Sequence, residues 1–167
     1  MPFGKKPEGR PARGQRAPLV SAGCVVTRTR NGQVEVLLVH PRGATFRKPL
    51  FGIPKGLVEQ GEPEQEAAVR ETREETGLEV VVRADLGTIR QKSGKIVHAF
   101  WAEPTAESLR TVDEHGRCTK GDPENDVCKF YPLDQAATLM IPEQRAFLQR
   151  LAPLLPEPNL AARTKDK

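Results

Sequence analysis

Cysteine and aromatic residues are scarce in this sequence of 167 residues. The three cysteines, Cys24, Cys118 and Cys128, are too few and odd in number for a disulfide scaffold, so we expect a reducing, cytoplasmic location. A zinc site made of His115, Cys118 and Cys128 is not expected, because a fourth ligand and the usual paired spacing are missing. The length suits one domain with a hydrophobic core and is too short for two ordinary domains.

Long apolar runs are missing as well. No stretch approaches the roughly 20 apolar residues that span a bilayer, so we expect no membrane partner. The first residues are basic, but no apolar stretch follows them, and a secretory signal is therefore not expected.

The net positive charge sits mainly at the two ends of the sequence. The formal net charge is +4 and the pI is about 9.1. Residues 1–18 hold five basic residues and one acid, whereas residues 19–156 hold 18 basic residues and 19 acids. We expect a disordered basic arm over residues 1–18, a domain over residues 19–156 and a disordered tail over residues 157–167. The arm is a possible contact for nucleic acid.

The pattern of apolar residues between these ends predicts several strands, one central helix and two late helices. Asn31-Gly32 is typical of a two-residue hairpin turn. Pro63 suits the first turn of a helix, and Gly77 suits its end. We expect strands at 20–26, 34–39, 50–53, 79–83, 87–91, 96–102 and 127–131, with late helices at 133–140 and 142–151. This order predicts an α/β fold of packed layers.

The central helix carries an unusual set of carboxylates. Glu71, Glu74 and Glu75 share an arc of about 100° on the helix, and Ala67 and Ala68 continue that face towards its beginning. A charge run of this kind is usually a solvated face. However, like charges four residues apart repel each other, and a cluster of oxygen ligands beside a glycine-containing loop suits Mg²⁺ or Mn²⁺. The helix geometry by itself leaves both interpretations open.

The segment from Gly56 to Leu78, GLVEQGEPEQEAAVRETREETGL, gives a more specific signal. Gly56, Glu62, Arg70-Glu71, Glu74-Glu75 and Gly77-Leu78 have the spacing of the Nudix box, so the sequence resembles the Nudix hydrolases. Thr72 stands where the family usually has an aliphatic residue, and it points towards the packing side of the helix.

The resemblance implies an α/β/α sandwich with a mixed sheet and hydrolysis of a nucleoside diphosphate derivative by water. It implies a Mg²⁺ cofactor, with Mn²⁺ as a substitute, held by Glu71, Glu74, Glu75 and the Gly56 carbonyl. Arg70 would orient a carboxylate of the box, and Glu62 would assist the loop or the metal site. The general base varies within the family, so the residues that could serve here are Glu71, Glu124 and Asp126.

Substrate recognition is less well defined by the residues. Lys55 lies against the metal loop, and the basic residues Arg47 and Lys48 precede it, so these three are candidates for binding phosphate. The Pro-Lys-Gly entry to the box resembles enzymes that act on dinucleoside polyphosphates or inositol polyphosphates. Two alternatives remain: a pyrophosphohydrolase directed to RNA or other nucleic acid by the basic arm, and a non-catalytic Nudix binding module. The intact Glu71, Glu74 and Glu75 argue against the module. The oligomeric state stays open.

Overall fold

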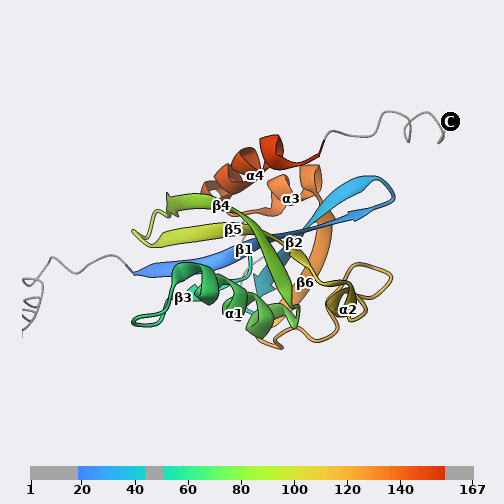
Figure 1. Cartoon of the computed structure of the whole chain (residues 1–167), viewed down its shortest axis with the longest axis horizontal. Helices are drawn as coiled ribbons and strands as arrows, with labels where there is room; N and C mark the ends of the chain where they lie inside the picture. The colour runs from blue at the N-terminus through green and yellow to red at the C-terminus, as the bar shows by residue number, and fades with distance from the viewer. Residues whose placement is uncertain (1–18, 44–50, 157–167) are drawn as a thin grey trace, which may run out of the picture.

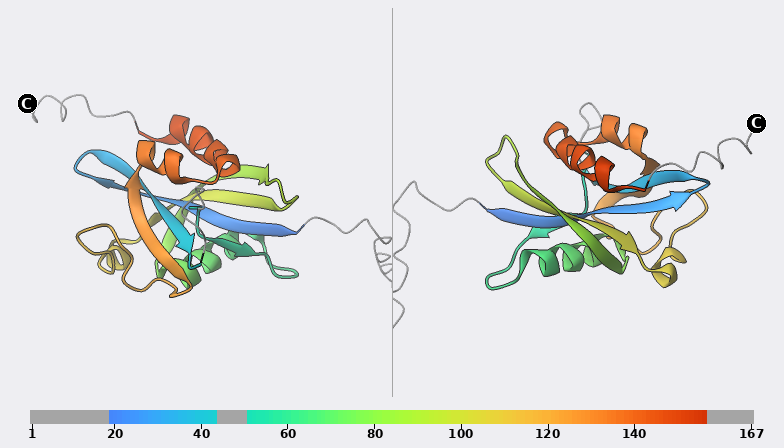
Figure 2. Two further views of the ribbon diagram at one scale, coloured as in Figure 1. Left: turned by 180° about the vertical axis from the view of Figure 1, so that it is seen from behind. Right: turned by 45° about the horizontal axis from the view of Figure 1, so that its top comes forward.

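The computed structural model describes residues 19–43 and 51–156 as a sheet covered by helices on both faces (Figure 1). Helix α1 (Glu64–Thr76) lies on one face, and helices α3 (Leu133–Leu139) and α4 (Arg145–Leu151) lie on the other (Figure 2). The predicted α/β/α sandwich with a mixed sheet is therefore confirmed. The expected arm, the expected tail and the phosphate-binding candidates Arg47 and Lys48 lie outside the described residues.

The strands follow the order β4-β5-β1-β2-β6 across the sheet. Strand β1 (Val20–Arg30) runs parallel to β5 (Ile96–Pro104) and antiparallel to β2 (Gln33–Pro41). The outer strands, β4 (Val80–Arg90) and β6 (Asn125–Pro132), are antiparallel to their neighbours. The sheet is mixed, and β1 is its central strand.

Strand β1 changes partner along its length. Its last residues pair with β2, from Thr27 to Arg30, whereas its first residues, Ser21 to Gly23, pair with the short strand β3 (Lys55–Leu57). Strands β2 and β3 therefore pair with the same edge of β1, but with different parts of it. This arrangement brings Lys55 and Gly56 to the middle of the sheet, beside Glu75 and Glu71 in the second half of helix α1.

The β1–β2 hairpin turns at Asn31 and Gly32, as predicted. Both residues have positive φ angles, 53° and 78°, which is the conformation of a two-residue turn that matches strand twist.

The strands expected at 79–83 and 87–91 are one continuous strand, β4, and that part of the prediction was wrong. The pairing with β5 has two irregularities, after Val82 and after Asp85. They let the strand continue through the residues at which the apolar pattern is interrupted. Gly87 has a φ of 76°, and its N–H donates to the Asp85 carboxylate at 2.7 Å. A bulge of this kind looks like a turn in the sequence because it uses the same residue types.

The connection from β5 to β6 holds one short helix, α2 (Ala106–Leu109), followed by turns. The two late helices are confirmed, although the second begins as the 3-10 turn Pro142–Gln144 and ends in another, Ala152–Leu154. No helix in the described ranges is long and apolar enough to cross a membrane.

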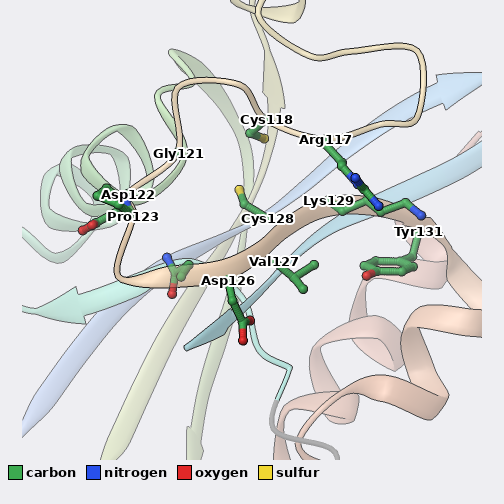
Figure 3. A pocket seen from close by; sticks show the side chains of 11 residues that line it. Arg117, Cys118, Gly121, Asp122, Pro123, Asp126, Val127, Cys128, Lys129 and Tyr131 are labelled. Carbon is green, nitrogen blue, oxygen red and sulfur yellow. The ribbon is translucent and has the colours of Figure 1, made fainter. Parts of the chain in front are cut away.

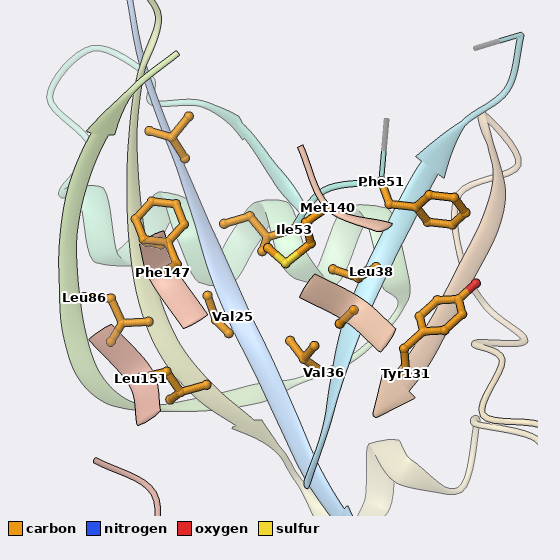
Figure 4. Close-up of a cluster of buried hydrophobic side chains, with 13 residues drawn as sticks. Val25, Val36, Leu38, Phe51, Ile53, Leu86, Tyr131, Met140, Phe147 and Leu151 are labelled. Atoms are coloured by element: carbon orange, nitrogen blue, oxygen red, sulfur yellow. The ribbon is translucent and has the colours of Figure 1, made fainter. Parts of the chain in front are cut away.

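Each face of the sheet buries its own hydrophobic cluster. The cluster under α3 and α4 contains large side chains, among them Leu86, Met140, Phe147 and Leu151 (Figure 4). The cluster under α1 combines larger side chains with several small ones, and the small ones are Ala22, Cys24, Ala67, Ala68 and Ala102. Helix α1 thus packs on the sheet through alanine rather than through bulky residues.

Candidate active site

The loop that leads into α1 is fixed to the sheet by close backbone contacts. Gly23 of β1 faces the turn at Pro54 and Lys55, and a Cβ atom at Gly23 would overlap the Pro54 carbonyl oxygen. The Cys24 N–H also donates to that carbonyl oxygen at 3.3 Å. The absence of a side chain at position 23 lets the loop approach β1 closely.

Helix α1 begins and ends where the sequence predicts, within one residue. Pro63 is the residue before the first helical turn, and its carbonyl oxygen accepts the Ala67 N–H at 3.0 Å. Gly77 ends the helix with a φ of 76°. Ala67 and Ala68 are fully buried, and so is Thr72, whose hydroxyl donates to the Ala68 carbonyl oxygen at 2.8 Å. The position where the box departs from the family pattern therefore faces the packing side, as expected.

Gly56 lies directly against the carboxylate of Glu71. A Cβ atom at position 56 would overlap both carboxylate oxygens and the carbon between them. Glycine is the residue that leaves room here, so the backbone of strand β3 and the Glu71 carboxylate form a single oxygen-rich surface.

Arg70 is the hub of the acidic residues around this surface. Its Nε donates to Glu62 at 2.8 Å, and its Nη1 donates to Glu71 at 2.9 Å and to Glu74 at 3.2 Å. Its Nη2 also donates to the Leu57 carbonyl oxygen at 3.2 Å. The hydrogen bond from Arg70 lowers the pKa of Glu62 to about 2, and the pKa of Arg70 is raised in return.

Glu66 is exposed, and none of the described hydrogen bonds or ion pairs of Arg70 involves it. Arg70 instead bonds to Glu62 and Leu57 of the loop, and to Glu71 and Glu74 of α1. Arg70 therefore fixes the positions of these carboxylates by charge-assisted hydrogen bonds.

Glu75 has the opposite electrostatic environment. Burial raises its pKa to about 7, and the nearby Glu71 and Asp122 carboxylates add to that effect. The Lys55 N–H donates to Glu75 at 3.3 Å, which lowers the pKa but does not outweigh the burial. A charged Glu75 is therefore undercompensated by its protein neighbours, and a cation would stabilise it.

Lys55 points into the same region and has a second cation beside it. Burial lowers the pKa of Lys55, and the neighbouring Lys95 ammonium lowers it further, against the attraction of Glu75 and Glu71. The sequence identifies both lysines as basic residues but gives no sign that they meet, because Lys95 lies in the turn between β4 and β5.

Gln144 is a residue of this region that sequence reasoning missed. It is fully buried, accepts the Ile53 N–H at 3.0 Å and donates to the Gln91 side chain at 3.3 Å. It thereby joins the segment leading to Lys55 to the turn that carries Lys95. The only signal in the sequence is one amide at the beginning of a predicted helix, and amides at such positions are usually exposed.

Asp126 and Glu124, two candidates for the general base, differ clearly in their contacts. Strand β6 has a pairing irregularity opposite His40 and Pro41, and Asp126 is the extra residue there. The Asp126 carboxylate lies 2.7 Å from Nδ1 of His40, a fully buried ring. Glu124 is exposed, and its described contacts are made by its backbone. The bulge therefore directs one of the two acids to a fixed position.

Trp101 and His98 lie on opposite faces of β5. The Trp101 indole donates to the Thr27 hydroxyl at 2.8 Å and packs against the cluster under α3 and α4, so it is part of the core on that face. His98 bridges Glu64 of α1 at 2.8 Å and Asp85 of β4 at 2.7 Å.

The described residues contain no ready-made group of three histidine, cysteine or acidic side chains spaced to hold a metal ion. Glu71 and Glu74 are bonded to Arg70, while Glu75 accepts from the Lys55 N–H, so the three carboxylates are separately held. Their donor chemistry still suits a hard cation, because all are oxygen ligands and the Gly56 backbone adjoins one of them.

Comparison with known proteins identifies the family. The NUDIX domain family model matches residues 17–151 of the chain. CTP pyrophosphohydrolase of Escherichia coli K12 is 31% identical over 116 residues, which cover 68% of this chain and 82% of that protein. A Caenorhabditis elegans protein named nudix hydrolase 1 is 36% identical over 90 residues, which cover 54% of this chain but only 24% of that longer protein.

The fold agrees with these sequence matches. The crystal structure of a C. elegans Ap4A hydrolase binary complex superposes with a TM-score of 0.64 at 24% identity, covering 80% of this chain and 96% of that one. The layered sheet, the box on α1 and the match along the described domain lead to one assignment. The chain belongs to the NUDIX domain family.

Proposed function

We propose that the chain is a Mg²⁺-dependent hydrolase that cleaves the pyrophosphate linkage of a nucleoside diphosphate derivative, with a nucleotide polyphosphate such as a dinucleoside polyphosphate as the favoured substrate. The observation that carries the proposal is the contact between the Gly56 backbone and the Glu71 carboxylate, next to the undercompensated Glu75. The E. coli relative is a CTP pyrophosphohydrolase, and the C. elegans protein of similar fold is an Ap4A hydrolase, which supports a nucleotide substrate here.

Four groups would hold the metal, with Mn²⁺ able to replace Mg²⁺: the Gly56 carbonyl, Glu71, Glu74 and Glu75. When bound, the cation would neutralise the pyrophosphate oxygens and lower the pKa of the attacking water. Before the metal binds, hydrogen bonds from Arg70 hold the Glu71 and Glu74 carboxylates in place. Glu62 in turn accepts a hydrogen bond from Arg70 and so fixes the guanidinium. Glu74 is the most available of the three carboxylates, since its side chain is 55% exposed.

Lys55 would bind a phosphate oxygen of the substrate beside the carboxylates. A second ammonium, that of Lys95, lies next to it, and two adjacent cations are most stable with an anion between them. Such an anion would be a phosphate of the polyphosphate chain. Arg47 and Lys48 remain predicted contacts to the same chain.

Asp126 is the general base in this proposal, in preference to Glu71 and Glu124. Glu71 is occupied by Arg70, and the exposed Glu124 makes only backbone hydrogen bonds within residues 19–43 and 51–156, so none of these residues orients its carboxylate. Asp126 is oriented by His40 and partly open to solvent, so its carboxylate is available to accept a proton from water.

The test is a screen of nucleoside diphosphate derivatives, including dinucleoside polyphosphates, with Mg²⁺ and with Mn²⁺. Phosphate released by a coupled phosphatase reports turnover. Metal-dependent turnover of at least one compound, lost on chelation, is the expected result. Binding of these compounds without turnover would contradict the proposal and favour a non-catalytic binding module.

A nucleic-acid-directed activity is the second candidate, favoured by the concentration of positive charge in residues 1–18. An RNA with a 5′-terminal polyphosphate would then be the substrate, held by the arm. We expect its affinity to fall steeply with salt and to lose that dependence when residues 1–18 are deleted. Equal turnover of RNA with and without the arm would exclude a role for it. Either substrate is consistent with the proposed cytoplasmic location.

A further inference from the structure

Cys118 and Cys128 face each other across two paired backbone segments. Arg117 pairs with Lys129 in an antiparallel bridge, which places Cys118 directly opposite Cys128, and the Cys118 N–H donates to the Cys128 carbonyl oxygen at 3.0 Å. Figure 3 shows the two sulfur atoms directed towards each other, one from strand β6 and one from the preceding connection.

This opposition has the geometry that a disulfide requires. Directly opposed residues of an antiparallel pair have Cα atoms about 4.5–5.5 Å apart, which falls within the range of about 4.4–6.8 Å for disulfides. The two thiols also interact with each other. A hydrogen bond between them, together with burial, raises the pKa of Cys128, so Cys128 keeps its proton longer.

The pair is accessible, whereas the third cysteine is not. Cys118 and Cys128 line a cavity of about 380 Å³ that also contains Asp122, Asp126 and Tyr131 (Figure 3). Cys24 is fully buried under α1, and burial raises its pKa to about 11. A small oxidant that enters the cavity would therefore meet the pair and not Cys24.

We propose that Cys118 and Cys128 are a modification site, at which a peroxide converts the two thiols reversibly into an intramolecular disulfide. The Cys118 sulfur, as thiolate, attacks one peroxide oxygen; the O–O bond breaks, and the leaving oxygen takes a proton to form water. The Cys118 sulfenic acid formed is then attacked by the Cys128 sulfur, which loses its proton as the S–S bond forms and a second water leaves. Two thiols are oxidised and one peroxide is reduced.

The disulfide would fasten a loop that rests on the end of α1. The Asp122 N–H donates to the Glu75 carbonyl oxygen at 2.8 Å, and Gly121 lies between that carbonyl and the Cys128 side chain. Closing the ring from residue 118 to residue 128 restricts this loop in the unfolded as well as the folded chain. We therefore expect oxidation to raise the Tm by roughly 5 °C or more and to slow exchange of the Asp122 amide proton.

A peptide map of the full chain tests the site without relying on any activity. The protein is treated with hydrogen peroxide, alkylated and digested with trypsin, which cleaves after Lys120 and so separates residues 118–120 from residues 121–129. A linked pair of these peptides, two hydrogens lighter than their sum and lost after thiol reduction, is the expected result. Two separately alkylated peptides, irreversible sulfinic acid, or linkage to Cys24 or to another chain would overturn the proposal.

Matched variants separate the pair from the third cysteine. Cys24→Ala should keep the linked peptides and the rise in Tm on oxidation, whereas Cys118→Ser and Cys128→Ser should lose both. A rise in Tm on oxidation of Cys118→Ser would contradict the assignment. If a serine variant does not fold, the map of the unaltered chain decides the question by itself.

Discussion

The two faces of the sheet bury different kinds of side chain and serve different ends. Under α3 and α4, bulky residues such as Phe147 and Leu151 fill the space between the layers. Under α1, the small residues Ala67 and Ala68 bring the helix close to the strands. Away from the sheet, Arg70 of the helix donates hydrogen bonds to the carboxylates of Glu62 and Glu71. Close packing through small residues is what allows the Gly56 backbone and the Glu71 carboxylate to meet.

Stability and chemistry are therefore concentrated in separate layers. A helix with a partly buried, undercompensated carboxylate such as Glu75 contributes charge at a cost to folding. The opposite face has few such groups and can offset that cost through apolar burial. Substitutions on the two faces should therefore affect different measurements.

Replacing Phe147 by alanine should produce the largest effect on stability. The ring is fully buried, and truncation of such a side chain costs about 3–5 kcal/mol. Denaturant unfolding measures the loss. Leu154→Ala, at a side chain that is half exposed, is the control and should change stability little. A lower kcat per folded molecule of Phe147→Ala would contradict the assignment of stability to one face of the sheet and chemistry to the other.

Replacing Glu75 by glutamine should abolish most activity and leave the fold intact. We expect a fall in kcat of about 10³-fold, the scale reported for removing one electrostatic group from an active site. Because the pKa of Glu75 is raised to about 7, its charge is destabilising above that pH, and the metal-free variant should be at least as stable at pH 8. Glu74→Gln should also be nearly inactive.

The control for these two variants is Glu66→Gln, which changes an exposed carboxylate of the same helix. It should retain full metal-dependent hydrolysis. Full activity of Glu75→Gln or Glu74→Gln would overturn the proposed metal ligands while leaving the family assignment in place.

Comparing Asp126→Asn with Glu124→Gln should sharpen the assignment of the base. Asp126 is oriented by His40, so its amide variant should lose about 10²-fold in kcat and the acidic limb of the pH–rate profile. The exposed Glu124 should tolerate the change. Equal losses in the two variants, with unchanged pH profiles, would return the role to Glu71.

The smallest effect should come from His98, which joins α1 to the sheet by charge. Burial lowers its pKa, but the hydrogen bonds that the protonated ring donates to the Asp85 and Glu64 carboxylates outweigh this and leave the pKa raised. Protonated His98 therefore stabilises the fold fully below about pH 6.5, its unfolded pKa, and this contribution is lost as the pH rises through the folded pKa.

The stability difference between the unaltered chain and His98→Gln should thus shrink from pH 6 towards pH 9. Thermal unfolding at several pH values measures it. His115→Gln, at an exposed histidine, is the matched control. A difference that grows with pH would show that the neutral ring, and not the ion pairs, holds α1.

The sequence predicts most of the fold because its signals are local. The Asn31-Gly32 turn, the end of the helix at Gly77 and the apolar strands each depend on a few neighbouring residues. The single strand β4 was not predicted, because the bulge at Gly87 resembles a chain reversal in composition.

The candidate site is predictable only in its helical part. The spacing of Glu71 and Glu75 on one helix follows from helix geometry. The approach of Lys95 to Lys55, of Gln144 to Ile53 and of His40 to Asp126 joins residues 40 to 91 positions apart, and depends on how the layers pack. No local pattern encodes such contacts.

Strand β1 limits where residues can be inserted or deleted in this chain during evolution. It pairs with β5 along one edge and shares its other edge between β2 and β3. Insertion or deletion of one residue inside β1 would invert every side chain beyond that point and disturb several ladders at once. Homologous chains should therefore vary here by replacement only, whereas the turns between α2 and β6 should tolerate added or lost residues.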